Sequence, residues 1–107
     1  MKNKASKKII NSDIILINLK KIKDQLKLYG VVKIGLFGSY ARNENTDQSD
    51  IDIIVEFNKD KKNFHNFMET CNIIEKSLNK KVDIVTNDSL SPYIKPYIEN
   101  EIIYEEL

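Results

Sequence analysis

The chain of 107 residues contains one cysteine, one histidine and one arginine, and these scarcities exclude several kinds of site. Cys71 has no partner in the chain, so the sequence excludes an intrachain disulfide and any zinc site built on paired cysteines. This cysteine usage favours a reducing compartment, and we expect a cytoplasmic protein. His65 has no histidine or cysteine partner with which to bind a metal, so we assign it no catalytic role.

Long apolar runs and an excess of charge of one sign are also absent. No uninterrupted apolar stretch approaches the roughly 20 residues that a membrane-spanning helix needs. The basic start of the chain leads into a segment broken by Asn11, Ser12 and Asp13, so we expect neither a signal peptide nor a membrane anchor. The 17 basic residues are balanced by 16 acidic ones, so a nucleic acid is not expected as a direct substrate.

The length and composition are those of one small folded domain. Typical domains contain about 50–250 residues, and 107 residues do not provide two cores. A hydrophobic content of 41% with 31% charged residues favours a folded chain over a disordered one. We expect residues 1–10 to form a flexible basic N-terminus and residues 11–107 to form the single domain, with a first helix capped by Asn11, Ser12 or Asp13.

Hydrophobic spacing predicts helices alternating with strands. The first helix has apolar residues at every third or fourth position, and Gly30 ends it. A second amphipathic helix is predicted over 64–78, and a third is predicted from Ser91-Pro92 through Ile98. Apolar and β-branched runs predict strands at 31–37, 51–55 and 81–86.

The most informative pattern joins a turn to two acidic residues. Gly38-Ser39 follows the first predicted strand, and ten residues separate it from Asp50-Ile51-Asp52 on the next one. Side chains two residues apart on a strand point to the same face, so Asp50 and Asp52 converge. Two close carboxylates repel unless a cation lies between them, and hard oxygen ligands favour Mg²⁺ or Mn²⁺. A Gly-Ser turn alone is often purely structural, but at this spacing it predicts a phosphate-binding turn beside a metal.

A third acidic residue and the single arginine extend the predicted site. Asp83 is either a partly exposed strand residue or, if its strand pairs beside the strand with the two aspartates, a third ligand in one cleft. Three carboxylates can hold two metal ions roughly 3.5–4 Å apart, which is the arrangement that nucleotidyl transfer needs. Arg42 is either a surface charge or a planar donor to the same phosphates, because it follows Ser39 by one helical turn.

These motifs resemble those of the minimal nucleotidyltransferases (MNT) of the DNA polymerase β superfamily. The resemblance covers nearly the whole chain and is carried by residues 38–42, 49–55, 82–85 and 94–104. It implies an α/β (α+β) fold of the polymerase-β-like nucleotidyltransferase type, a small mixed sheet flanked by helices that lie mainly on one face. The family commonly has glycine after the arginine, where this chain has Asn43, a residue type that tolerates the left-handed conformation.

The resemblance also implies an activity and a partner. Small members of this family resemble the antitoxins of HEPN/MNT toxin–antitoxin pairs, which transfer AMP from ATP to a tyrosine of a helical HEPN ribonuclease toxin. The expected partners are therefore ATP and such a toxin, in a hetero-oligomer. The catalytic residues and ligands of two Mg²⁺ ions, for which Mn²⁺ can substitute, would be Asp50, Asp52 and Asp83. The ATP phosphates would be bound by Gly38, Ser39 and Arg42.

Two other functions stay open from the sequence. The chain is alternatively a non-catalytic antitoxin that neutralises its toxin by binding, or a nucleotidyltransferase for a small molecule, although it lacks a second domain to enclose such an acceptor. A ribonuclease of the toxin type is excluded, because such a toxin has an Arg-x₄₋₆-His motif. In this chain the single arginine, Arg42, and the single histidine, His65, lie too far apart to form it. Three tyrosines near the C-terminus could stack on a base or meet a partner, but we expect core packing for at least two of Tyr93, Tyr97 and Tyr104.

Overall fold

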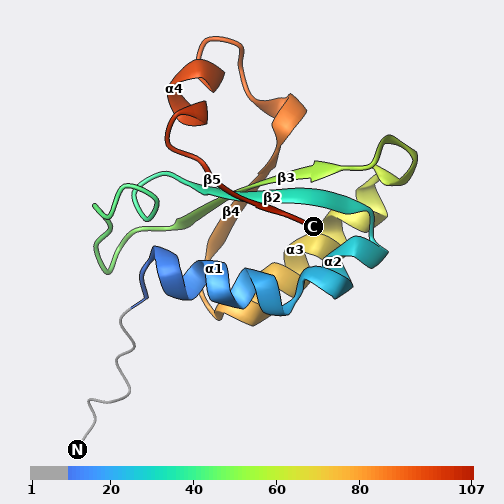
Figure 1. The fold of residues 1–107 in the computed structure, drawn as a ribbon, viewed down its shortest axis with the longest axis horizontal. Helices are drawn as coiled ribbons and strands as arrows, with labels where there is room; N and C mark the ends of the chain where they lie inside the picture. The colour runs from blue at the N-terminus through green and yellow to red at the C-terminus, as the bar shows by residue number, and fades with distance from the viewer. Residues whose placement is uncertain (1–9) are drawn as a thin grey trace, which may run out of the picture.

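In residues 10–107 a mixed four-stranded sheet carries three helices on one face (Figure 1). The structure, a computed structural model, describes residues 10–107, so all but the last residue of the predicted N-terminal extension lies outside the described residues. The elements are α1 (Ser12–Lys21), α2 (Lys23–Leu28), β2 (Val31–Phe37), β3 (Ile51–Phe57), α3 (Phe64–Leu78), β4 (Val82–Thr86), α4 (Lys95–Glu99) and β5 (Ile103–Glu106), with short 3₁₀ turns at Lys59–Lys61 and Asn87–Ser89.

The first predicted helix is divided into two. Asn11 caps α1 by accepting a hydrogen bond from the Ile14 N–H at 3.0 Å, so one of the three expected caps is confirmed. At Ile22 the last turn of α1 tightens, because its N–H bonds to the carbonyl of Leu19 rather than one residue further back. The Ile22 side chain stays buried, so the apolar stripe runs through the break. Gly30 follows α2 with φ +91°, as predicted for a residue that ends a helix.

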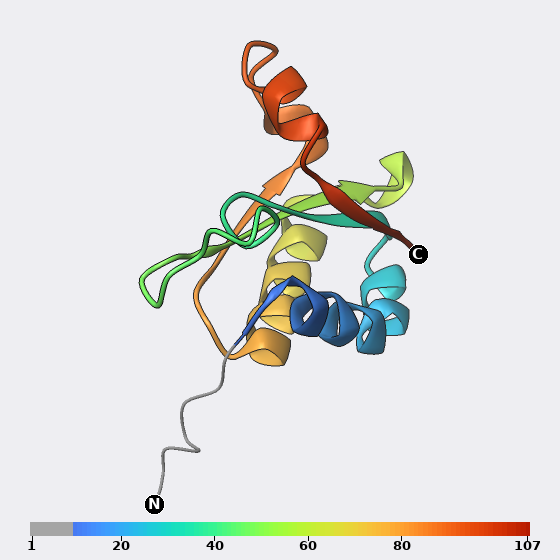
Figure 2. The same ribbon diagram turned by 60° about the vertical axis from the view of Figure 1, so that its left-hand side comes forward.

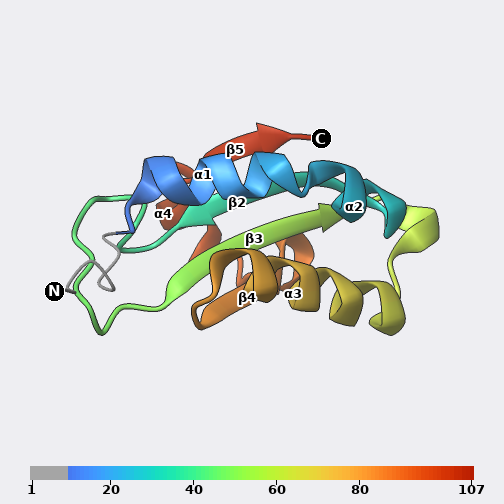
Figure 3. The same ribbon diagram turned by 90° about the horizontal axis from the view of Figure 1, so that it is seen from below.

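The core lies between the sheet and helices α1, α2 and α3, which cover the same face (Figure 3). Alternate residues of the two central strands point into it, as the period of two along a strand requires. Ile10, in the expected N-terminal extension, also packs against this core. Its fully buried side chains include Ile15, Leu19, Leu26, Ile34, Leu36, Ile51, Ile53, Val55 and Ile74.

Sheet topology decides where the predicted site residues lie. The strand order is β4-β3-β2-β5, in which β3 runs antiparallel to β2 and parallel to β4. The register sets Asp52 opposite Asp83 of β4 on one side and opposite Phe37 of β2 on the other. Since residues 51, 53 and 55 fill the core, Asp52 projects from the opposite, open face of the sheet.

The C-terminal segment crosses the open face of the sheet and adds β5, a strand that the sequence patterns did not predict. Strand β5 pairs antiparallel with β2, and Gly35 leaves room for it: a Cβ atom at Gly35 would press on Ile102, Ile54 and Tyr104. Ile54 is 2% exposed, so this contact forms a second, smaller apolar cluster. The open face is therefore partly closed near the end of β2.

Helix α4 lies on the other side of the sheet from α1–α3 and is shorter than predicted (Figure 2). It begins at Lys95, because residues 91–94 form a turn in which Ser91 Oγ accepts the Tyr93 N–H at 3.1 Å. The expectation of core packing for at least two of the three tyrosines is wrong. Tyr93 and Tyr97 are 84% and 81% exposed, since they lie on a segment that stands away from the sheet, and Tyr104 is 39% exposed.

Across residues 10–107, none of the helices combines the length and the apolar character needed to cross a membrane.

Candidate active site

The turn after β2 has the backbone conformation expected of a binding loop. Gly38 has φ +79° and Asn43 has φ +60°. Asn43 therefore adopts the left-handed conformation at the position where the family commonly has glycine. The turn is closed by hydrogen bonds from the Arg42 N–H to the Gly38 carbonyl at 3.2 Å and from the Glu44 N–H to the Ser39 carbonyl at 2.9 Å. Tyr40 is 3% exposed and anchors the turn in the core.

Glycine at position 38 brings this turn against the acidic residues. A Cβ atom built on Gly38 would overlap the carboxylate of Asp52, so only glycine permits this approach of the backbone. The positive φ at the same residue is a second requirement for glycine. The Gly38 turn and Asp52 therefore form one site, at the left-hand side of Figure 1 where β2 ends and β3 begins.

The three predicted acids lie at or just before the starts of the neighbouring strands β3 and β4. The pairing on which the role of Asp83 depends is present: Asp52 and Asp83 are register partners on adjacent parallel strands, which lie roughly 4.8 Å apart. Asp50 precedes Asp52 by two residues and is exposed. Burial raises the pKa of the Asp52 carboxyl, and the negative charges of Asp83 and Asp50 raise it further. Asp52 therefore experiences both of the other carboxylates.

The oxygen ligands of Asp50, Asp52 and Asp83 are of the type that a hard divalent cation prefers, although the three side chains do not surround a common position. Among the described residues, no three histidine, cysteine, aspartate or glutamate side chains are grouped closely enough to hold a metal ion as they stand. The pKa of Asp52 is raised by its burial and by the charges of Asp83 and Asp50, although Arg42 acts to lower it. Lys81 lies 3.8 Å from an oxygen of Asp50, but both side chains are largely exposed and such a pair contributes little. A cation between the carboxylates would relieve their repulsion.

The Arg42 guanidinium is hydrogen-bonded to two glutamates. Its Nε donates to Glu44 at 2.9 Å, and its Nη1 donates to both carboxylate oxygens of Glu101 at 3.1 Å. Glu101 also accepts the Gly38 N–H, at 2.8 Å. The sequence patterns did not identify Glu101, because it lies 63 residues from Gly38 and belongs to no local motif. The only signal for it would have been the pairing of β5 with β2, which the short strand did not reveal.

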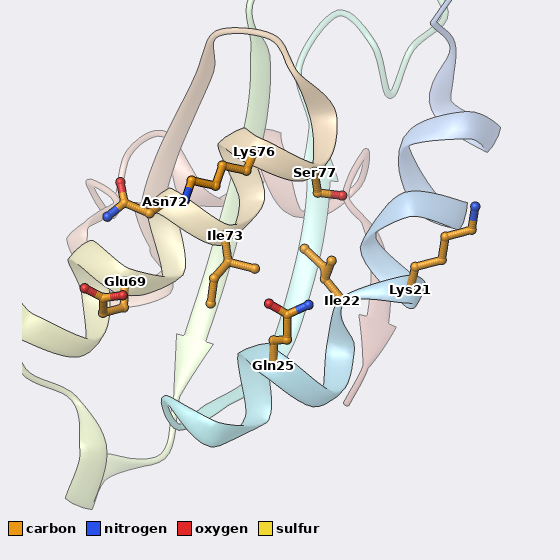
Figure 4. A pocket seen from close by; sticks show the side chains of 8 residues that line it. All are labelled: Lys21, Ile22, Gln25, Glu69, Asn72, Ile73, Lys76 and Ser77. Carbon is orange, nitrogen blue, oxygen red and sulfur yellow. The ribbon is translucent and has the colours of Figure 1, made fainter.

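A groove of about 480 Å³ lies elsewhere, between α1–α2 and α3 (Figure 4). Its lining side chains come from these helices and the break at Ile22, among them Lys21, Gln25, Glu69 and Lys76. These helices cover the face of the sheet opposite to Asp52, so this groove is separate from the acidic site.

The pKa of Asp52 gives a test of the acidic cluster without any ligand. A carboxyl whose folded-state pKa is raised above its ordinary value of 3.8 stabilises the fold only while protonated, and this contribution is lost as pH rises through the raised pKa. In EDTA, Asp52→Asn should therefore melt above wild type at pH 7, by roughly 2–4 °C, and the gap should close toward pH 4. Thermal unfolding monitored by circular dichroism measures both.

Asp47→Asn is the matched control, because Asp47 is exposed in the loop between β2 and β3. It should leave the pH dependence of melting unchanged. Equal melting temperatures of wild type and Asp52→Asn at pH 7 would show that the acids do not repel one another in the folded chain.

Comparison with known proteins identifies the family. Residues 19–104 match the model of the nucleotidyltransferase domain. A protein of Methanocaldococcus jannaschii named "Putative protein adenylyltransferase" is 47% identical over 89 residues, which cover 80% of this chain and 89% of that protein. The protein adenylyltransferase MntA of Thermococcus cleftensis is 35% identical over 82 residues, covering 77% of this chain and 82% of MntA.

Two solved structures have the same architecture. The structure of a "putative minimal nucleotidyltransferase" superposes with a TM-score of 0.77 at 24% identity and covers 91% of this chain and 98% of that one, which shows the fold. An MNT antitoxin in complex with the tri-AMPylated HEPN toxin of Shewanella oneidensis gives a TM-score of 0.58 at 25% identity, with 84% of this chain and 70% of that chain covered. The family match, the relatives and the mixed sheet with its helices on one face lead to one conclusion: this chain is a member of the nucleotidyltransferase family, in the form of a minimal nucleotidyltransferase domain.

Proposed function

We propose that the chain transfers AMP from ATP to a hydroxyl group of a partner protein and that it acts as an antitoxin. The observation that carries the proposal is the register of β3 and β4, which sets Asp52 beside Asp83 on the open face, next to the Gly38 turn. The names of the relatives, protein adenylyltransferases, support AMP as the transferred group and a protein as the acceptor. The expectation of a cytoplasmic location stays a prediction from the sequence.

In this proposal the acids hold metal and the turn holds phosphate. Asp50 and Asp52 would bind two Mg²⁺ ions, and Asp83 would complete the site of one of them and accept the proton of the incoming hydroxyl. Bound Mg²⁺ would supply charge compensation for the phosphate oxygens. The Gly38 N–H and the Ser39 hydroxyl would position the β- and γ-phosphates, with the Arg42 guanidinium neutralising charge beside them.

The proposed acceptor is a tyrosine of a HEPN-type toxin in a hetero-oligomer with this chain. The support is the solved complex in which an MNT antitoxin accompanies a tri-AMPylated HEPN toxin. A tyrosine hydroxyl has an ordinary pKa of about 10, so at neutral pH it needs a nearby base to become nucleophilic. Asp83, exposed on the open face of the sheet, is accessible to such an acceptor.

One observation favours a second candidate function, neutralisation by binding alone. Tyr93, Ile94 and Tyr97 are exposed on the segment around α4, so they offer apolar surface to a partner. Aromatic side chains of this kind are enriched where proteins meet. Occlusion by this surface would not require the three acids.

Isotope-labelled ATP distinguishes these functions. The purified chain is incubated with Mg²⁺, the product of the neighbouring gene, and ATP labelled either at the α- or at the γ-phosphate. AMP transfer predicts that the partner gains label from α-labelled ATP and none from γ-labelled ATP. Label from the γ-position would indicate a kinase, and no label with either ATP, in a complex that still forms, would leave occlusion as the function.

Gly38→Ala should disrupt the site through the backbone. The new Cβ would overlap the Asp52 carboxylate and the residue would keep a left-handed φ, so we expect about 1–3 kcal/mol of destabilisation. AMP transfer should fall by at least about a hundredfold, since displacement of reacting groups by about 1 Å costs that much. Denaturant unfolding and the rate of pyrophosphate release measure the two effects.

Gly30→Ala is the matched control. Gly30 also has a positive φ, and its Cβ would press on Lys61 rather than on the site. It should cost comparable stability and leave the rate of the folded protein near that of wild type. Similar rate losses in both variants would show that Gly38 has only a structural role.

A further inference from the structure

A carboxylate of the chain itself already occupies the turn that would bind phosphate. Glu101 Oε2 accepts the Gly38 N–H at 2.8 Å, and both of its oxygens accept from Arg42 Nη1 at 3.1 Å. These two donors are the ones that the proposed function assigns to the ATP phosphates. A carboxylate bound by a backbone N–H and a guanidinium makes the same charge-assisted hydrogen bonds as a phosphate oxygen.

The fold places Glu101 there through its backbone. Strand β5 pairs Ile103 with Leu36, and continuing this antiparallel register by two residues sets Glu101 opposite Gly38. The next residue, Ile102, packs where a Cβ atom on Gly35 would lie. Because the residues from Ile103 onward are paired with β2, a change of the Glu101 rotamer would move its carboxylate off the turn without separating the strands.

Glu101 and a phosphate group cannot share these donors. The side chain of Glu101 is 23% exposed, so its charge is only partly screened by water. The Glu101 charge also contributes to raising the pKa of Asp52, which places it within the electrostatic reach of the acidic cluster. A triphosphate that approached the turn would meet a negative charge already bound to the Gly38 N–H and to Arg42.

We propose that the Glu101 carboxylate is an internal competitor for the nucleotide phosphates, which holds the Gly38 turn until the triphosphate displaces it by rotation of the side chain. This inference rests on the proposed assignment of the turn to phosphate binding. Glu101 then lowers the affinity of the site for any polyphosphate, and its removal strengthens binding. A residue that only supports the turn would have the opposite effect.

Calorimetric titration with inorganic tripolyphosphate in Mg²⁺ tests this sign. Glu101→Ala should bind tripolyphosphate about tenfold more tightly than wild type, which corresponds to about 1.4 kcal/mol and to the net value of one charge-assisted hydrogen bond. Glu101→Gln should bind more tightly by a smaller factor, because the neutral amide still accepts the Gly38 N–H. Glu99→Gln, which removes one exposed charge from the same segment, should bind like wild type.

The Gly38 amide resonance provides an independent readout. Tripolyphosphate should move this resonance in wild type, and Glu101→Ala should move it before any ligand is added. Weaker tripolyphosphate binding by both Glu101 variants would overturn the inference, as would the absence of binding by wild type and all variants. If Glu101→Ala does not fold, the isosteric Glu101→Gln decides the sign.

Tripolyphosphate contains no AMP, so the test is separate from the proposed function. Tighter binding by the Glu101 variants together with no labelling of a partner by ATP would retain the competitor and reject the transferase. Labelling of the partner by ATP together with weaker tripolyphosphate binding by the Glu101 variants would retain the transferase and reject the competitor.

Discussion

Asp50→Asn/Asp52→Asn is expected to lose Mg²⁺-dependent binding of ATP. Asp50 directly precedes β3 and its charge raises the pKa of Asp52 within that strand, so in the proposed site the two would hold the nucleotide through metal rather than by direct contact. Loss of even an outer partner of a metal ligand costs about 10- to 100-fold in metal affinity, so loss of two ligands should weaken ATP binding by at least that factor. Calorimetry with and without EDTA measures it.

The fold of this double variant should persist, because the substitutions relieve repulsion around Asp52. Asp47→Asn, in the exposed loop before β3, is the control and should bind ATP as wild type does. If ATP binds wild type equally well in Mg²⁺ and in EDTA, the proposed metal site is wrong.

Asp83→Asn should slow AMP transfer while largely preserving the binding of ATP. Asp83 is exposed beside Asp52 on β4, where an incoming hydroxyl can reach it, whereas the Gly38 turn and Asp50 do not depend on it. The rate of AMP transfer should fall by about a hundredfold to a thousandfold, the scale of losing one preorganised group that stabilises developing charge. ATP affinity should change only a few-fold. Pyrophosphate release at saturating ATP measures the rate.

The exposed Asp60, in the 3₁₀ turn after β3, offers a matched substitution for this experiment. Asp60→Asn should retain the wild-type rate. A near-normal rate for Asp83→Asn would show that Asp83 does not accept the proton of the incoming hydroxyl.

The two central strands and α3 could be predicted because their patterns are local and strong. Ile51, Ile53 and Val55 of β3 point into the main core and leave Asp52 on the other face, where Ile54 is buried near Gly35. Helix α3 extends from Phe64 to Leu78, as its apolar spacing predicts. In both cases the residue pattern and the packing surface have the same period.

The break at Ile22 and strand β5 could not be predicted, for different reasons. Ile22 remains buried through the break, so the apolar period gives no sign of it. Strand β5 has four residues, and its stability comes from pairing with β2 and from the space over Gly35 rather than from its own pattern. Pairing between residues this far apart in the sequence is a tertiary property.

For the candidate site, the sequence pointed to residues but not to their contacts. The spacing from Gly38 to Asp52 predicted one site, and the structure places the Gly38 turn against Asp52 and Asp52 beside Asp83. Arg42 was expected to be either a surface charge or a phosphate donor, and the structure shows it bound to two glutamates. Neither Glu44 nor Glu101 has a sequence signal that marks it as a partner of this arginine.

The central claim is that the chain modifies a partner protein, and the intact mass of that partner tests it most directly. The product of the neighbouring gene is co-expressed with wild type or with Asp83→Asn, and both cultures are followed for growth and then by mass spectrometry. The account predicts that the partner gains units of about 329 Da, the mass of one added AMP, only with wild type, and that Asp83→Asn binds it without restoring growth. A partner of unchanged mass that is silenced equally by both versions would contradict the account.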